Sequence, residues 1–133
     1  MQHIVLDTSI LVAAAHAENS ASRQIVEACL RQELIAVASR AIKAEYELIL
    51  ARAVRKSDYD EELAELLEGL QLVEPKEVPR VVPDDAEDDK FVAAATTGRA
   101  RWIVTNDRHL LELDPYQDVR IISPSEFAGG MLP

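Results

Sequence analysis

The sequence predicts a three-layer α/β/α sandwich around a parallel sheet of four or five strands. Short apolar runs alternate with longer stretches in which apolar residues recur at helical spacing. The apolar runs hold few polar residues, which is typical of strands covered on both faces, as in parallel sheets. With 133 residues and 48% hydrophobic content, the chain has the size of a single domain, residues 1–133.

Five short apolar runs are expected to be the strands. They cover residues 3–6, 34–38, 72–73, 101–105 and 119–122. The third run ends before Pro75, which has no N–H with which to continue a ladder. Residues 75–85 contain three prolines and are expected to be a connection.

Helices are expected over residues 9–17, from 20 or 22, from 39, from 57, over 85–97 and over 109–113. Ser39 is a good N-cap, because its oxygen can accept a free N–H of the first turn. Ser57, with Asp60 three positions on, resembles a capping box. Gly98 is expected to end the fifth helix in the left-handed conformation. The short polar tail from residue 123 is assigned no element.

Composition argues against several classes of protein. The aromatic content of 5% makes a base-stacking sheet surface of the RNA-recognition type unexpected. No apolar stretch is long enough to span a bilayer, and no basic-then-apolar leader opens the chain. The single Cys29 cannot form an internal disulfide and is expected to be a small buried side chain. These features together predict a cytoplasmic protein.

The formal net charge of −10 argues against unspecific binding of nucleic acid over the whole surface, because phosphates repel carboxylates. One stretch is a candidate for a local basic patch. It contains Arg40, Lys43, Arg52, Arg55 and Lys56. The alternative for this stretch is an ordinary solvated helix face.

Asp7 and Asp107 each follow a predicted strand, and they are the most informative residues of the chain. Asp7 comes directly after the run 3–6, and Asp107 follows the run 101–105. Open α/β sheets bind ligands at the carboxyl ends of their strands, so both acids are expected at one edge of the sheet. Capping of the following helix is the alternative role for each acid.

Two further acids are expected on helices close to this edge. Glu45 lies six residues after the Ser39 cap, on an otherwise apolar face, with an ordinary exposed glutamate as the alternative. Asp89 ends a run with five acids in six positions, most of which are expected only to stabilise a helix dipole. Asp88 cannot face the same site as Asp89 equally well, because consecutive helical residues point about 100° apart.

Grouped carboxylates repel each other and raise each other's pKa values. No lysine is expected near them, so a divalent cation is predicted to balance their charge. Mg²⁺ prefers such oxygen ligands, and either Mg²⁺ or Mn²⁺ can activate a water for attack on phosphorus. Short polar side chains beside the acids are expected to orient carboxylates or waters, with turn and cap chemistry as the alternative. They are Thr8, Ser9, Thr105 and Asn106.

Several other kinds of site are absent from the sequence. There is no Gly-x-x-x-x-Gly-Lys-Ser/Thr loop for nucleoside triphosphates, no Gly-x-Gly-x-x-Gly after the first strand, and no Gly-x-Ser-x-Gly elbow. His3, His16 and His109 do not have zinc-binding spacing. His109 is close to Asp107, and a solvated loop position is expected for it, with substrate contact as the alternative.

Four motifs, in order, resemble those of PIN-domain nucleases over residues 3 to about 127. They are Ile-Val-Leu-Asp-Thr-Ser-Ile-Leu-Val at 4–12, Ser-x5-Glu at 39–45, Asp-Asp-Lys-Phe-Val-Ala-Ala-Ala at 88–95 and Trp-Ile-Val-Thr-Asn-Asp at 102–107. The Asp-Asp-Lys-Phe segment and Ser-Pro-Ser-Glu-Phe at 123–127 resemble the branch of PIN-family toxins akin to VapC.

The resemblance implies a Mg²⁺- or Mn²⁺-dependent ribonuclease with Asp7, Glu45, Asp89 and Asp107 as the catalytic, metal-binding acids. Asp88 is the alternative third acid, since this branch carries adjacent acids here. The resemblance also implies a toxin that cleaves single-stranded RNA, a homodimer, and an antitoxin protein that covers the pocket. A catalytically silent PIN-fold binding protein and a receiver-type Mg²⁺-binding signalling module are the alternatives, although no strand-end lysine of the receiver type is present.

Overall fold

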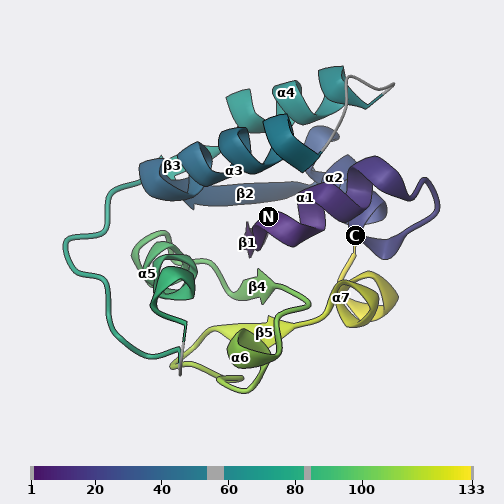
Figure 1. Cartoon of the computed structure of the whole chain (residues 1–133). Helices are drawn as coiled ribbons and strands as arrows, with labels where there is room; N and C mark the ends of the chain where they lie inside the picture. Colours follow the sequence, from purple (N-terminus) through teal and green to yellow (C-terminus); the bar gives the residue numbers. More distant parts are fainter. Residues whose placement is uncertain (1, 54–58, 83–84, 133) are drawn as a thin grey trace.

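In a computed structural model that describes residues 2–53, 59–82 and 85–132, the chain forms a five-stranded sheet flanked by helices (Figure 1). The strands are β1 (Gln2–Leu6), β2 (Leu34–Ser39), β3 (Gln71–Val73), β4 (Trp102–Val104) and β5 (Arg120–Ile122). Every neighbouring pair is parallel, in the order β3-β2-β1-β4-β5. The predicted fold class and the predicted strands are confirmed.

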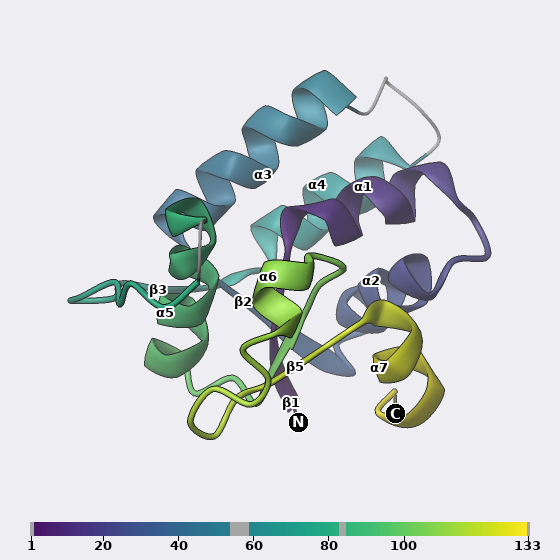
Figure 2. The same ribbon diagram turned by 60° about the horizontal axis from the view of Figure 1, so that its bottom comes forward.

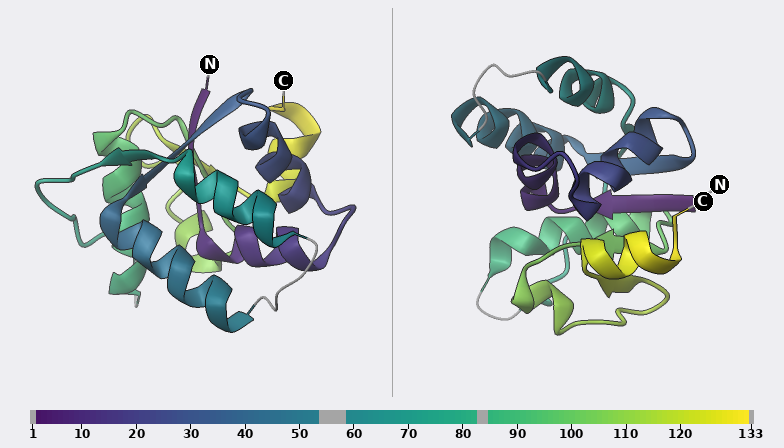
Figure 3. Two further views of the ribbon diagram at one scale, coloured as in Figure 1. Left: turned by 90° about the horizontal axis from the view of Figure 1, so that it is seen from above. Right: turned by 90° about the vertical axis from the view of Figure 1, so that its right-hand side faces the viewer.

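Helices cover both faces of this sheet. They are α1 (Thr8–His16), α2 (Ala21–Leu30), α3 (Arg40–Ala53), α4 (Asp60–Glu68), the 3-10 helix η1 (Ala86–Asp88), α5 (Asp89–Thr97), α6 (Arg108–Leu111) and α7 (Pro124–Gly130). Helices α1, α3 and α4 lie on one side of β1 and β2, and α5 lies on the other (Figures 1 and 3). Among the described helices, none is long and apolar enough to cross a membrane.

The strand order creates a switch point beside the central strand β1. The chain runs outward from β1 to β2 and β3, and then returns to the opposite side of β1 as β4. Leu6 is paired with Val104, and the Asp7 N–H donates to the Val104 carbonyl oxygen over 3.0 Å. Residues that follow β1 and β4 therefore meet where open α/β sheets bind ligands. Receiver domains have the strand order 2-1-3-4-5, so the topology argues against the receiver alternative.

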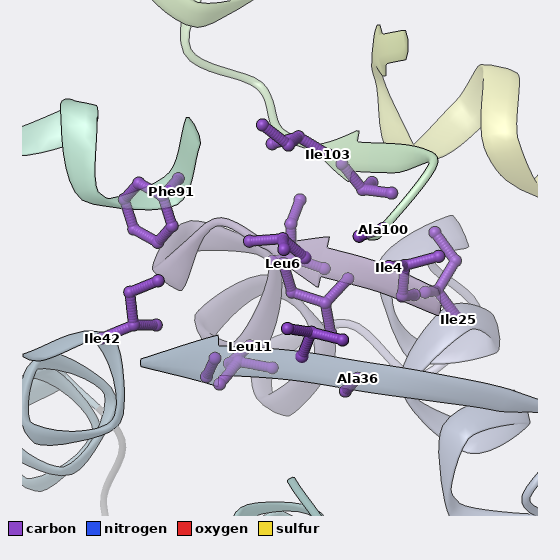
Figure 4. Packing of buried hydrophobic residues seen from close by; sticks show 14 of the residues in the cluster. Ile4, Leu6, Leu11, Ile25, Ala36, Ile42, Phe91, Ala100 and Ile103 are labelled. Atoms are coloured by element: carbon purple, nitrogen blue, oxygen red, sulfur yellow. The ribbon is translucent and has the colours of Figure 1, made fainter. Parts of the chain in front are cut away.

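Burial of the sheet on both faces explains why the strands are continuous apolar runs in the sequence. Figure 4 shows side chains from the sheet and from helices on both of its faces meeting around β1. Leu11 of α1, Ile42 of α3 and Ile103 of β4 are completely buried, and Phe91 of α5 is nearly so. A strand covered on both faces needs apolar residues at every position and not only at alternate ones.

Two of the predicted helix N-caps are confirmed, and a third lies outside the described residues. The Ser39 hydroxyl oxygen accepts from the Ile42 N–H over 3.2 Å, as expected of an N-cap at α3. The Ser20 oxygen likewise accepts from the Arg23 N–H over 3.1 Å at α2. The predicted cap at Ser57 falls in the part of the chain that the structure does not describe.

The tail beyond residue 122 forms α7, a helix that the sequence analysis did not assign. The Ser123 oxygen accepts from the Glu126 N–H over 3.2 Å, and Pro124 occupies the first turn. Phe127 is fully buried and meets Trp102 edge to face, with ring centroids 5.8 Å apart. The burial of one aromatic ring therefore fixes this short segment on the domain.

The prediction of a left-handed Gly98 is wrong. Gly98 follows α5 with φ −86°, and the left-handed residue is Arg99, with φ 56°. A Cβ at Gly98 would lie 2.6 Å from Val37 Cγ1, so the glycine is required by close packing and not by its backbone angle. Cys29 is half-buried, and burial raises the pKa of its thiol to about 12.

Candidate metal centre

Asp7 follows β1, and its carboxylate accepts hydrogen bonds from two hydroxyls, one close in sequence and one from the residue after β4. Thr105 Oγ1 donates to Asp7 Oδ2 over 2.8 Å, and Ser9 Oγ donates to the same oxygen over 3.0 Å. The Asp7 side chain does not cap α1, so the alternative role for this acid is not adopted. Burial has the largest influence on the pKa of Asp7 and raises it, while the two hydroxyl donors oppose the rise.

Asp107 follows β4 and is connected to Asp7 through Thr105. The Asp107 N–H donates to Thr105 Oγ1 over 2.9 Å, and Thr105 itself is fully buried. Asp107 Oδ1 also accepts from the His109 N–H over 2.8 Å and so caps α6. The charge of Asp107 contributes to the raised pKa of Asp7. The structure therefore brings the two strand-end acids together, as the sequence predicted.

Asp88, at the end of η1, faces other carboxylates. Burial, and after it the neighbouring carboxyls of Asp107 and Asp85, raise the pKa of Asp88 to about 8. The neighbouring Asp88 carboxyl in turn lowers the pKa of Asp107. Asp88 Oδ2 is buried, and no donor of the described residues reaches it. The alternative third acid of the sequence analysis thus lies within the site.

Asp85 was not singled out from the sequence. It precedes η1, and its carboxylate belongs to the same cluster: ligand atoms of Asp85, Asp107 and His109 all lie within 4.8 Å of one another. The sequence offered no signal for it, because its place beside Asp88 depends on the 3-10 turn, in which residues three apart are eclipsed. His109 Nδ1 is also 3.9 Å from Asp107 Oδ1, which places this histidine next to the cluster.

Asp89 points in a different direction from Asp88. Its side chain is buried, with 3% of the residue exposed, and Oδ1 accepts from the N–H groups of Val81 and Val82 over 3.0 and 2.8 Å. Asp89 is thus engaged with the backbone of the segment before η1. This placement does not favour the metal-binding role that the sequence analysis gave to Asp89.

Glu45 projects from α3 and is paired with a lysine. Lys90 Nζ lies 2.7 Å from Glu45 Oε1, and Thr8 Oγ1 donates to the other carboxylate oxygen. The side chains of Lys90 and Glu45 are 15% and 29% exposed, so the pair is partly shielded from water. The expectation that no lysine lies near the acids is wrong, because the first turn of α5 carries Lys90 across to α3.

The other candidate residues are divided between the centre and the surface. Thr8, Ser9 and Thr105 contact the acids as described, whereas Asn106 is exposed. In the basic stretch, Arg40 is exposed and pairs with Glu74 over 3.1 Å. Its members at positions 55 and 56 lie outside the described residues.

The acids around Asp107 fit a hard divalent cation. Asp7, Asp85, Asp88 and Asp107 offer carboxylate oxygens, and one of these oxygens is buried with no donor reaching it from the described residues. A buried carboxylate oxygen without a donor requires a proton or a cation. Carboxylate oxygens are the ligands that Mg²⁺ and Mn²⁺ prefer. Helices α1, α3, α5 and α6 gather around this edge (Figure 2).

Comparisons with known proteins agree with this fold. The VapBC2 complex of Rickettsia felis, solved bound to a promoter DNA fragment, has a chain with TM-score 0.61 and 15% identity, covering 92% of this chain and 98% of that one. PAE2754 of Pyrobaculum aerophilum has TM-score 0.55 and 18% identity, covering 97% and 88%. No curated protein matches significantly in sequence. The family model of the PIN domain matches residues 3–109, and the chain therefore belongs to the PIN-domain family.

Proposed function

We propose that this PIN-domain protein is a metal-dependent endoribonuclease and the toxin of a toxin–antitoxin pair. One observation carries the proposal: Asp88 Oδ2 is buried on a half-buried side chain beside Asp107 and Asp85, and no donor of the described residues reaches this oxygen. A carboxyl in this position must either keep a proton or face a cation, because an unpaired buried charge is costly. A centre that binds a cation explains why the fold retains it.

Asp7, Asp88 and Asp107 are the acids that would hold the ion, with Asp85 and His109 at the side of the cluster. A bound Mg²⁺ or Mn²⁺ supplies a Lewis acid and lowers the pKa of a coordinated water. Thr105 fixes the relative positions of Asp7 and Asp107, since it donates to one and accepts from the other. Such partners orient ligands and typically affect metal affinity about 10–100-fold.

Glu45 has a different place in this scheme. Lys90 balances its charge and Thr8 fixes its orientation, so Glu45 stands at the edge of the acids without adding to their mutual repulsion. A carboxylate held in this way is suited to accept hydrogen bonds from a substrate or a water beside the ion. Metal binding by Glu45 itself, as the sequence analysis expected, remains a prediction.

Single-stranded RNA is the proposed substrate, and its binding would depend on local contacts. The net charge of −10 opposes attraction over the whole surface. An antitoxin protein would bind the same edge, and an Arg or Lys inserted among the acids would replace the ion. The similarity in fold to a chain of the VapBC2 complex is consistent with such a partner. A cytoplasmic homodimer is the proposed state.

The test is cleavage of a mixed single-stranded RNA pool with Mn²⁺, Mg²⁺ or EDTA. The wild type should cut only with metal, and Asp7→Asn should abolish cutting while melting near the wild-type temperature. Asp118→Asn is the matched control, because Asp118 is exposed in the turn before β5 and should leave cleavage unchanged. Cleavage by Asp7→Asn, or cleavage in EDTA, would refute the proposal. Metal binding without any cleavage would support the catalytically silent PIN-fold alternative.

A further inference from the structure

The Asp89 carboxylate accepts hydrogen bonds from two consecutive backbone N–H groups in the segment between β3 and α5. Val81 and Val82 donate to the same oxygen, Oδ1, over 3.0 and 2.8 Å. The acceptor belongs to the first residue of α5, and the donors lie seven and eight residues earlier in the chain. A charged acceptor with two short N–H bonds is among the strong hydrogen-bond arrangements in proteins.

From this point, backbone hydrogen bonds lead directly to the acids of the metal centre. The Val82 carbonyl oxygen accepts from the Asp85 N–H over 3.4 Å, and the Asp85 carbonyl oxygen accepts from the Asp88 N–H over 3.1 Å. Val82 itself is buried, with 7% of the residue exposed, which fixes the start of this series in the core. Backbone hydrogen bonds thus connect Asp85 and Asp88 to Val82, whose N–H donates to Asp89.

We infer that Asp89 is a positioning residue, which anchors Val81 and Val82 so that Asp85 and Asp88 face Asp107, and that Asp89 does not itself bind the ion. The inference rests on the proposed metal centre. It also explains why adjacent acids are useful at the start of α5. Asp88 is directed at the carboxylates, and Asp89 is directed at the backbone that presents them.

The variants Asp88→Asn, Asp89→Asn and Asp89→Ala separate the two roles. The asparagine at position 89 keeps a carbonyl oxygen that can accept from both N–H groups, whereas alanine keeps no acceptor. Glu87→Gln is the control, because this side chain is 89% exposed and belongs to the same acidic run. Mn²⁺ affinity is measured by electron paramagnetic resonance titration without RNA, and exchange of the Val81 and Val82 amides is measured by NMR.

Asp88→Asn should weaken Mn²⁺ binding roughly 10-fold or more and leave the two amides protected. Asp89→Asn should stay within about threefold of the wild type, since its acceptor remains. Asp89→Ala should weaken Mn²⁺ binding roughly 10-fold and speed exchange of both amides. Glu87→Gln should match the wild type in both measurements.

Loss of Mn²⁺ binding in Asp89→Asn, with both amides still protected, would show that Asp89 is a ligand and would overturn the inference. Unchanged Mn²⁺ binding in Asp89→Ala would overturn it as well, because the anchor would then be dispensable. A wild type that binds no Mn²⁺ would overturn both this inference and the metal centre on which it rests. The expected pattern of Mn²⁺ affinities in a protein that cuts no RNA would refute the proposed nuclease and leave the role of Asp89 intact.

Discussion

Replacing Gly98 by alanine tests how closely α5 packs on the sheet. Gly98 has φ −86° and ψ 2°, a conformation that alanine can adopt. A Cβ there would lie 2.6 Å from Val37 Cγ1, 3.1 Å from the Ala94 carbonyl oxygen and 3.3 Å from Val73 Cγ1. All three distances are shorter than ordinary van der Waals contacts of a Cβ atom. Either the end of α5 moves away from β2 and β3, or the two valines leave their positions.

The size of the effect follows from two opposing contributions. Overpacking of a filled core costs about 1–3 kcal/mol, and the lower entropy of unfolded alanine returns about 0.4–1 kcal/mol. With the middle of each range, the net loss in the free energy of unfolding is about 1.3 kcal/mol. With about 2.1 cal/mol/K of unfolding entropy per residue over 133 residues, the melting temperature should fall by roughly 5 °C.

Gly69→Ala is a closely matched control for this experiment. Gly69 follows α4 as Gly98 follows α5, with φ −88°, but a Cβ there would meet nothing nearer than a carbonyl oxygen at 3.5 Å. Its melting temperature, recorded by circular dichroism in EDTA, should be unchanged or higher by roughly 1–3 °C. If the two variants melt together, contact with Val37 is not the reason for glycine at position 98.

Three further substitutions test the centre and one ion pair. Thr105→Val removes the donor to Asp7 at nearly constant volume, so the free energy of unfolding measured with denaturant should fall by about 1–3 kcal/mol and Mn²⁺ should bind less tightly. Wild-type values in both measurements would disprove the connecting role of Thr105. Lys90→Met leaves Glu45 without its cation, so added Mn²⁺ should raise the melting temperature of this variant more than that of the wild type, and equal shifts would contradict that reasoning. The pKa of Asp114 is lowered by its arginine partner, so its contribution to stability is complete above the unfolded-state pKa of about 3.9 and is lost as pH falls through the lower folded-state value. The melting temperatures of wild type and Asp114→Asn should therefore converge as pH falls below about 4, and a constant difference would contradict this assignment.

The position of Asp7 and Asp107 could be predicted because it depends on few assumptions. Once two apolar runs are parallel strands of one sheet, their carboxyl ends lie at the same edge. The register of β1 and β4, with Leu6 beside Val104, then brings the residues after them together. Neither step requires knowledge of how any helix packs.

The choice among the acids of the 84–89 run could not be made in this way. It depends on a 3-10 turn before α5 and on two N–H groups at Val81 and Val82, and neither has a sequence pattern of its own. Gly98 is similar, because its neighbour Val37 is remote in sequence. The helix α7 differs from both cases. Ser123 followed by Pro124 is typical of a helix start, but the polar residues and paired glycines that follow indicated an irregular tail.

Three consecutive residues at the start of α5 serve three different neighbours. Asp88 faces the carboxylates of Asp107 and Asp85, Asp89 faces the Val81 and Val82 backbone, and Lys90 faces Glu45 on α3. Helical side chains leave the axis about 100° apart, so three successive positions reach three directions. If this charge pattern were shifted by one position toward the N-terminus, the lysine would stand at position 89 and face the backbone N–H groups, and the anchor would be lost. The order of Asp, Asp and Lys, and not merely their charge, therefore determines how this edge of the sheet is built.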